Sequence, residues 1–184
     1  MPIDTLTLIW LFPAAFMLHD FEEIIFSEAW QRKNAEEIKR RIRKSVPAFL
    51  AEQMCAALDK PTAELALPIS LIFLMTILST YLAAVYGKMD FFLLASGLFF
   101  LHGFMHLGQA ILLRRYIPAV ITSVVIAIPY GLVLFSRLIG EGIVDISRLL
   151  IYLPIVLVLG IPFILVMHVV GDYLYKKISV ILVD

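Results

Sequence analysis

Long apolar segments recur along the chain and are separated by shorter polar stretches. Each segment holds about 20 residues or more, which is the length that an α-helix needs to cross the ~30 Å hydrocarbon core of a bilayer. The pattern predicts an all-α protein, an integral membrane bundle of five transmembrane helices that forms a single membrane domain over residues 1–184. The predicted spans lie near residues 5–27, 64–86, 90–113, 117–137 and 149–172.

Residues 28–63 form the one sizeable polar stretch, between the first two predicted spans. The charged run from Glu28 to Lys44 predicts a helix that could extend the first span, and Pro47 then precedes a second helix. We expect a cytoplasmic or interfacial helical segment here, which either lies on the anionic membrane surface or is a solvated loop that enforces the topology. Four apolar residues of the second helix are spaced for one of its faces, namely Phe49, Leu50, Met54 and Leu58.

The composition supports a membrane location and limits the classes of partner. Hydrophobic residues make up 61% of the chain and charged residues 16%, whereas a soluble domain is nearer half apolar and a quarter charged. Fifteen cations balance fifteen acidic residues, so no basic surplus exists to neutralise nucleic-acid phosphates. We therefore expect membrane lipids as partners, and no nucleic acid.

The cations are unevenly distributed between the two sides of the predicted bundle. Twelve of the fifteen fall on the side that holds residues 28–63, and three, namely Lys88, Arg137 and Arg148, fall on the other side. Because the cytoplasmic loops of membrane proteins are enriched in Lys and Arg, this distribution predicts an outside N-terminus and a cytoplasmic C-terminus. We expect a multi-pass protein of the inner, cytoplasmic membrane.

The first predicted span contains the run His19-Asp20-Phe21-Glu22-Glu23. An ionisable side chain at membrane depth costs roughly 2.5–3.5 kcal/mol on insertion scales, so four of them in five residues are not explained by packing. On a helix His19, Glu22 and Glu23 stand at i, i+3 and i+4 and share one face. This spacing is typical of a metal-binding or proton-handling cluster.

All four histidines of the chain lie inside predicted spans. His102 and His106 are separated by one helical turn, the spacing with which two imidazoles bind one metal ion, and His168 and Asp172 have the same spacing. Counted at ~1.5 Å per residue from the basic residues that end each span, the ionisable groups of the first, third and fifth helices lie at a similar depth, about 12–15 Å. We expect these three helices to form one common site and the second and fourth helices to be peripheral.

The motif His19-Asp20-Phe21-Glu22-Glu23 inside a first membrane helix resembles the HXXEE family of small bacterial membrane proteins. The length, the repeated apolar segments and the later histidines are compatible with a resemblance over the whole chain. The resemblance implies that His19, Glu22 and Glu23 are the motif residues, and it supplies no substrate.

Two kinds of metal centre fit the candidate residues. A catalytic zinc site uses three protein ligands and an open position for water, and a diiron site would instead consume most of the cluster as bridging and terminal ligands. Imidazole and carboxylate suit zinc or iron better than magnesium or calcium, so we expect one of these two metals. The candidate metal ligands are His19, Glu23, His102, His106, His168 and Asp172, with His102, His106 and His168 as the zinc set.

Glu22 and Glu23 are the candidate catalytic residues. Adjacent residues on a helix point ~100° apart, so the two carboxylates cannot face one ion equally. Glu23 stacks nearly above His19, four residues earlier, and is therefore the favoured ligand or water-activating base, while Glu22 would support it.

We interpret the chain as an intramembrane metal-dependent enzyme that acts on a lipid-like or membrane-embedded substrate from the cytoplasmic leaflet. A hydrolase is the favoured reaction class, and a diiron oxidase is the other. The alternative is a transporter that carries protons or metal ions through the same Glu and His residues. A purely structural membrane subunit ranks third, because it would leave the cost of the buried carboxylates unexplained.

Overall fold

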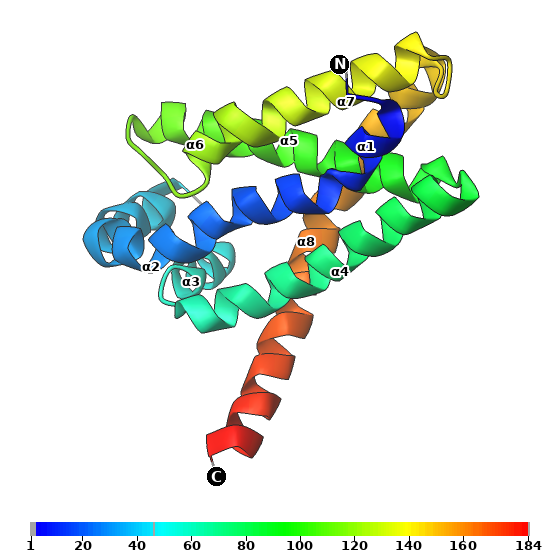
Figure 1. Cartoon of the computed structure of the whole chain (residues 1–184). Coiled ribbons are helices and arrows are strands. Elements are labelled where there is room, and N and C mark those ends of the chain that lie inside the picture. Colours follow the sequence, from blue (N-terminus) through cyan, green and yellow to red (C-terminus); the bar gives the residue numbers. More distant parts are fainter. Residues whose placement is uncertain (1–2, 46, 184) are drawn as a thin grey trace.

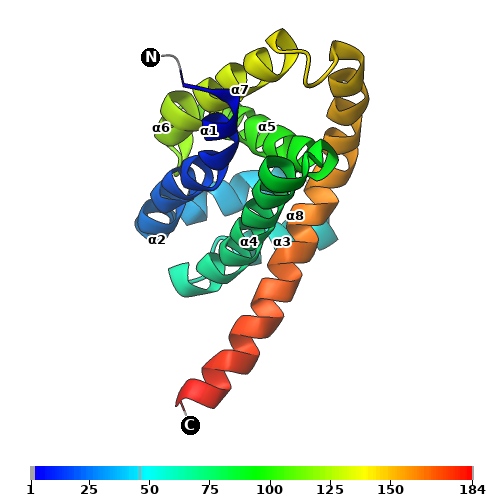
Figure 2. The same ribbon diagram turned by 45° about the vertical axis from the view of Figure 1, so that its right-hand side comes forward.

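The structure is a computed structural model that describes residues 3–45 and 47–183, without the side chains at positions 49, 50, 53, 54, 57, 161, 182 and 183. Within these residues the chain is helical and forms no strand. Figures 1 and 2 show the arrangement of the helices. Their bounds are α1 Thr5–Trp10, α2 Phe12–Ser45, α3 Ala48–Ala57, α4 Thr62–Tyr86, α5 Met89–Leu113, α6 Val120–Thr122, the π-helical η1 Ser123–Ala127, α7 Ile128–Gly140 and α8 Ile146–Val183.

The predicted all-helical membrane bundle is confirmed. Four helices are long and apolar enough to cross a membrane, namely Thr62–Tyr86, Met89–Leu113, Val120–Gly140 and Ile146–Ile181, and they match the last four predicted spans. The first predicted span forms α1 and the first half of α2, an N-terminal helix that packs along α4 and η1. This helix is less apolar than the other four because it carries Asp20, Glu22 and Glu23.

The polar stretch 28–63 is helical, as expected. The second half of α2 continues the first predicted span without a break through Ser45, and α3 follows it. A contact between Lys39 Nζ and Asp59 Oδ1, 2.6 Å apart, ties α2 to the link between α3 and α4. The predicted apolar face of α3 depends on Phe49, Leu50 and Met54, whose side chains lie outside the described part of the structure, while Leu58 is partly buried.

Two irregularities in the helices occur close to prolines. The N-terminal helix is interrupted at Leu11, just before Pro13, and the π-helical η1 lies directly before Ile128 and Pro129. A proline has no N–H to donate to the preceding turn and its ring crowds that turn, which accounts for a break or a widened turn at such positions. Pro162 lies inside α8, whose helix continues through it.

The second predicted span, α4, is not peripheral, and this corrects the sequence-based expectation. It packs against α2, α5 and α8, so it lies between the helix that carries the motif and the last helix. The expectation relied on ionisable residues alone. The face that α4 buries carries the small polar side chains Thr76, Ser79 and Thr80, and small side chains at membrane-helix interfaces let neighbouring helices approach closely.

Two glycines of α8 hold this helix close to its neighbours. A Cβ atom on Gly171 would lie 2.6 Å from Pro68 Cδ and 2.8 Å from the backbone nitrogen of Pro68, so α8 crosses α4 at backbone contact. A Cβ atom on Gly160 would lie 2.6 Å from Leu98 Cδ1 of α5. Beyond the crossing with α4, the C-terminal part of α8 extends away from the other helices (Figure 1).

Candidate metal centre

The HXXEE run on α2 directs its carboxylates to different neighbours. Glu22 is buried and faces the segment around α6, whereas the partly buried Glu23 lies near α5. The angle of ~100° between adjacent helical residues accounts for this difference. The two carboxylates are therefore not equivalent in their surroundings.

Three histidines from α2 and α5 converge in the interior of the bundle. His19, His102 and His106 each offer a ring nitrogen, and these three nitrogens lie within 4.8 Å of one another. The Nε2 atoms of His102 and His106 are 2.8 Å apart, and the His19 ring lies 5.5 and 5.3 Å from the rings of His102 and His106, centroid to centroid. Ligand nitrogens bound at about 2.0–2.1 Å to a tetrahedral zinc ion are about 3.4 Å apart, so small side-chain movements would suffice to hold one ion.

Thr122 determines which nitrogen of His19 carries the proton. Its hydroxyl lies 2.6 Å from Glu22 Oε2 and 3.2 Å from His19 Nδ1. A hydroxyl has one proton to donate, and the charged carboxylate at the shorter distance takes it, so Thr122 Oγ1 accepts the hydrogen bond from His19 Nδ1–H. Nε2 of His19 is then left with a free lone pair, and it has no hydrogen-bond partner among the described residues.

Both carboxylate oxygens of Glu22 accept hydrogen bonds from the short segment 116–122. The Tyr116 hydroxyl donates to Oε1 at 2.8 Å, and the backbone N–H groups of Ile121 and Thr122 donate at 3.3 and 2.7 Å, in addition to the Thr122 hydroxyl. Burial raises the pKa of the Tyr116 phenol, and Glu22 raises it further, so this hydroxyl remains a donor. Glu22 therefore anchors the segment and orients His19 through Thr122, as outer partners of metal-binding histidines do.

The turn that supplies these donors is itself attached to α2. Arg115 donates to both carboxylate oxygens of Glu37, at 2.9 and 2.8 Å, and to Asn34 Oδ1 at 2.8 Å. Arg115 and Arg41 keep the pKa of Glu37 below its usual value. Trp30 Nε1 donates to the Tyr116 carbonyl at 2.7 Å, so the turn between α5 and α6 is fixed to α2 about two to four turns beyond the motif.

A second group of possible ligands adjoins the histidine triad. Asp20, Glu23 and His102 each offer one ligand atom, and these atoms also lie within 4.8 Å of one another. Glu23 Oε2 is 4.0 Å from His106 Nε2. Asp20 is buried, and its Oδ2 has no hydrogen-bond partner in the described part of the chain. Carboxylates thus lie directly beside the imidazoles.

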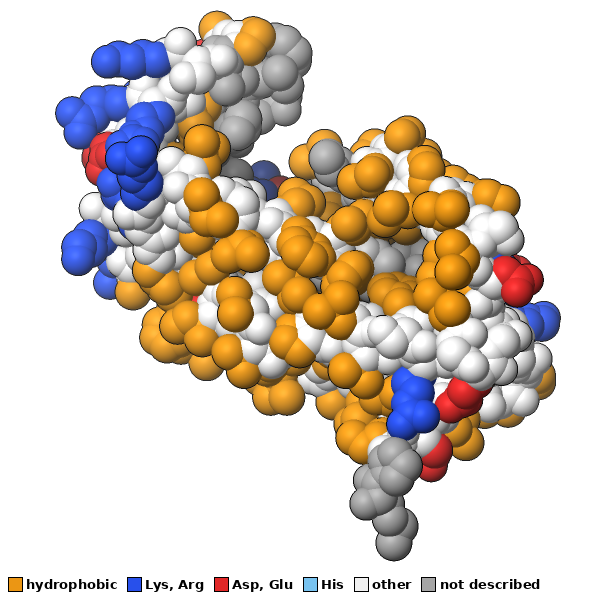
Figure 3. Space-filling model, turned by 90° about the horizontal axis from the view of Figure 1, so that it is seen from above, with side chains coloured by type: hydrophobic (Ala, Val, Ile, Leu, Met, Phe, Trp, Pro, Cys, Tyr) orange, Lys and Arg blue, Asp and Glu red, His pale blue; other side chains and the backbone are white. Residues whose placement is uncertain are grey.

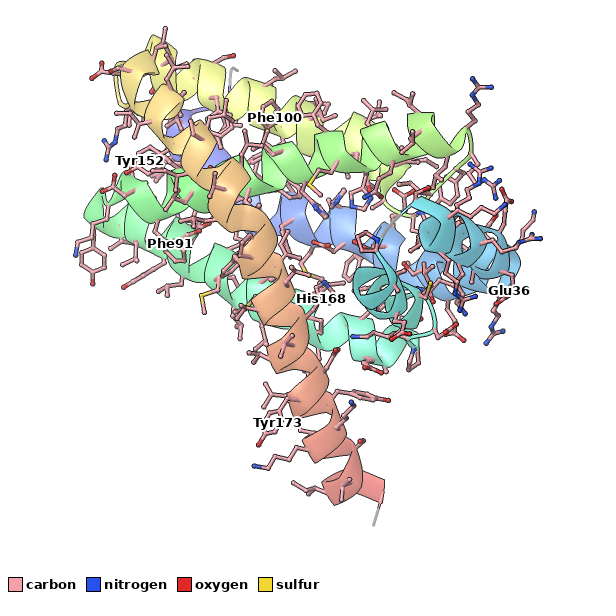
Figure 4. The ribbon with its side chains drawn as sticks, turned by 180° about the vertical axis from the view of Figure 1, so that it is seen from behind. Glu36, Phe91, Phe100, Tyr152, His168 and Tyr173 are labelled. Carbon is pink, nitrogen blue, oxygen red and sulfur yellow. The ribbon has the colours of Figure 1, made fainter. Side chains whose placement is uncertain are left out.

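The two predicted ligands on α8 lie outside the triad. His168 lines the same cavity as Asp20, Glu23 and His102, and Figure 4 labels it on the part of α8 that crosses α4. Asp172 forms an ion pair with Lys60, which is 3.8 Å from Glu64 Oε1. The structure therefore brings four of the predicted ligands together, places His168 across the cavity, and pairs Asp172 with a lysine.

This cavity, of about 260 Å³, lies between α2, α4, α5 and α8. Its polar wall contains Asp20, Glu23, His102, His168 and Thr76, and the remaining side chains that line it are apolar. The candidate metal centre therefore adjoins an apolar chamber inside the bundle.

Three residues of the site were not among the sequence-based candidates. Asp20 could have been recognised, because it is a carboxylate inside an apolar run and is one turn before Glu23. Thr122 and Tyr116 carry no such signal, since hydroxyl side chains are common in membrane helices and at their ends. Only the fold shows that they meet Glu22, about a hundred positions earlier in the chain.

The helical bundle with buried histidines and carboxylates defines a helical membrane protein with a polar interior site. The chain belongs to the family described as protein of unknown function with HXXEE motif, whose model matches residues 10–134. That range contains the motif, the three clustered histidines and the partners of Glu22, whereas His168 and Asp172 lie beyond it. Comparison with curated proteins and with solved structures found no match.

Proposed function

We propose that the protein is an intramembrane metal-dependent enzyme, with a hydrolase as the favoured reaction class, that acts on a lipid-like substrate. The observation that carries the proposal is the convergence of ring nitrogens of His19, His102 and His106 within 4.8 Å, beside a buried Nε2 of His19 that has no hydrogen-bond partner among the described residues. A buried polar atom without a partner costs about 1–3 kcal/mol, and a bound cation would remove this cost. The hydrogen bond from His19 to Thr122 further prepares Nε2 of His19 as a ligand.

The donor set suits one zinc or iron ion. Three neutral imidazoles leave the fourth position of a tetrahedral site open for water, which is the arrangement of catalytic zinc sites. Magnesium and calcium prefer shells made of oxygen atoms. A diiron centre fits less well, because the two groups of ligands share His102, and a neutral imidazole has one lone pair for a metal.

Glu23 is the proposed general base. When bound, the ion would supply Lewis acidity and lower the pKa of a water molecule. Glu23 would accept a proton from this water, whose oxygen then bonds to the electrophilic carbon or phosphorus of the substrate. The bond to the leaving oxygen breaks, and that oxygen takes the proton from Glu23, so one water is consumed for each bond that is cleaved.

The shape of the chamber favours an enzyme over the transporter that the sequence also suggests. A carrier of protons or metal ions needs polar groups along a path through the membrane. Few polar side chains line this cavity. On α5 and on α8 a single histidine is polar, His102 and His168, and the other residues of these helices that line the cavity are apolar. The described cavity thus resembles a binding site for an apolar molecule next to a reactive centre.

Reconstitution with metal tests this proposal. Protein loaded with zinc or iron and placed in lipid vesicles is expected to release the polar group of an acyl-ester or phosphoester lipid, measured by mass spectrometry. Glu23→Gln should retain the metal and lose at least about 100-fold in rate, because a positioned base contributes typically 10²–10⁴-fold. Transfer of metal across the vesicle membrane without turnover of any lipid would contradict the enzyme and support the carrier.

We also propose an outside N-terminus and a cytoplasmic C-terminus, so that the site is reached from the cytoplasmic leaflet. Figure 3 shows that Lys and Arg side chains gather at one end of the molecule, and the second half of α2 is rich in them. Because cytoplasmic loops of membrane proteins are enriched in Lys and Arg, this end of the molecule is the proposed cytoplasmic end.

Cysteine labelling tests the proposed topology. A cysteine placed at Arg40, in a variant in which Ser replaces Cys55, should react with an impermeant maleimide only after the membrane is opened. If this cysteine is labelled in intact cells, residues 28–63 lie outside and the proposed topology is wrong.

A further inference from the structure

Apolar stripes on α4, α5 and α8 line most of the chamber, and those on α5 and α8 each end in a histidine. On α5 the lining residues follow helical spacing from Phe91 to His102, and on α8 they follow it from Ile155 to His168. In both stripes the histidine is the last residue and every other side chain that lines the cavity is apolar. The chamber therefore has one reactive end, next to the candidate metal centre, and one apolar end.

The size of the chamber matches a single hydrocarbon chain. Eleven residues separate Phe91 from His102, which corresponds to about 16 Å along the helix axis. One leaflet of a bilayer provides about half of the ~30 Å hydrocarbon core, so a lipid chain in it has a similar length. The volume of about 260 Å³ is slightly below that of most small-ligand pockets, about 300–1,000 Å³, and favours one chain over two.

Close helix contacts hold the walls of the chamber in place. α8 contacts α4 through Gly171 and Pro68, next to His168, and it contacts α5 through Gly160 and Leu98, in the middle of the apolar part. At Gly171 a Cβ atom would meet the backbone of Pro68, so α8 and α4 touch at backbone distance there, whereas at Gly160 it would meet the end of the Leu98 side chain. These contacts hold α8 against α4 and α5 on two sides of the chamber.

We propose that the chamber binds the single long apolar chain of a membrane amphiphile, with its polar group beside Asp20, Glu23 and His102, and that Phe91 and Ile155 limit the length of the chain. This inference rests on the proposed function, since it names the class of substrate for that site. Asp20 and Glu23 offer carboxyl oxygens to the polar group, and Asp20 Oδ2 has no partner among the described residues. An uncharged head with hydroxyl donors, such as that of a monoacylglycerol, fits this end.

Photocrosslinking in phosphatidylcholine vesicles tests the position of the chain. Two monoacylglycerol probes are used, one with a diazirine at the chain end and one with a diazirine beside the ester. The end-labelled probe should mark residues near Phe91 and Ile155, and the ester-labelled probe should mark residues near His102 and His168, as read by peptide mass spectrometry. If both probes mark the exposed face of α8 around Val158 and Val169 alike, the chain binds only as surrounding lipid and the proposal fails.

A variant with a shortened chamber tests the length limit. Ala95 lines the chamber between Phe91 and His102, so Ala95→Phe should reduce crosslinking of a long-chain probe at least tenfold and leave a short-chain probe nearly unchanged. Val158→Phe, at a 69% exposed position on α8, is the matched control and should change neither. Equal loss for both chain lengths, in Ala95→Phe protein that keeps the melting temperature of the wild type, would overturn the length limit.

These experiments separate the chamber from the metal centre. Chain binding is measured without metal, so wild-type protein that crosslinks as expected but binds no metal would overturn the proposed function and leave the chamber intact. Metal-loaded protein whose probes mark only the outer face of α8 would overturn the chamber and leave the metal centre intact.

Discussion

Replacing His106 by alanine is expected to abolish high-affinity metal binding. The substitution removes one of three imidazoles whose ring nitrogens lie within 4.8 Å of one another, and the two that remain cannot complete a three-ligand site. Loss of an outer partner of a ligand lowers metal affinity by about 10–100-fold, so loss of a ligand should exceed about 100-fold. Isothermal titration calorimetry of the chelator-treated protein with zinc measures this loss of metal affinity.

Two matched variants make that result specific. Glu28→Gln changes a carboxylate on α2, the helix of His19, that contacts Arg32 and Thr62 away from the histidine triad, and it should leave metal affinity unchanged. His168→Ala removes the histidine that lies across the chamber and should change affinity by less than His106→Ala does. If His106→Ala binds metal like the wild type while His168→Ala does not, the triad was assigned to the wrong histidines.

The same substitution at two adjacent positions is expected to affect different properties: Glu22→Ala should lower stability, and Glu23→Ala should remove the chemistry of the site. Glu22 accepts hydrogen bonds from the backbone N–H groups of Ile121 and Thr122 and from two hydroxyls. A hydrogen bond to a charged group contributes about 1.5–3 kcal/mol, so losing the two from the backbone should destabilise the fold by roughly 3–6 kcal/mol. Glu23 anchors no such segment, so Glu23→Ala should change stability little and remove the chemistry of the site.

Thermal unfolding in detergent, together with metal titration, compares the two variants. At roughly 2–4 °C per kcal/mol for a chain of this length, Glu22→Ala should lower the melting temperature by several degrees, whereas Glu23→Ala should stay near the wild type. A melting temperature lowered equally in both variants would mean that the two carboxylates share one structural role. That outcome would contradict the division of tasks between them.

The helices could be predicted from the sequence because length and hydropathy determine membrane helices almost directly. Backbone polar groups must be satisfied within each helix in a bilayer, so each apolar run of sufficient length gives one helix. The interruption at Leu11 and the π-helical turn at Ser123–Ala127 were not predicted, although each lies close to a proline, Pro13 and Pro129. The position of α4 could not be predicted, because its interface is made of small side chains rather than of charged ones.

The candidate site could be predicted in part for a similar reason. His19, Glu23, His102 and His106 were recognisable, since ionisable residues inside a membrane helix are costly and helical spacing shows which of them share a face. The spacing of residues along the sequence does not show how α8 is rotated about its axis. This rotation places His168 at the chamber and Asp172 beside Lys60. The hydrogen bonds of Glu22 depend on a turn that is distant in sequence, so Thr122 and Tyr116 required the fold.

The metal content and coordination of the wild-type protein test the central claim most directly. Protein purified without chelator should contain zinc or iron, and X-ray absorption at the edge of that metal should show several imidazole nitrogens at about 2.0–2.1 Å. Protein that copurifies with no metal, and that binds none when it is titrated with zinc or iron near neutral pH, would contradict the metal centre. The buried histidines and carboxylates would then be better explained as a proton relay.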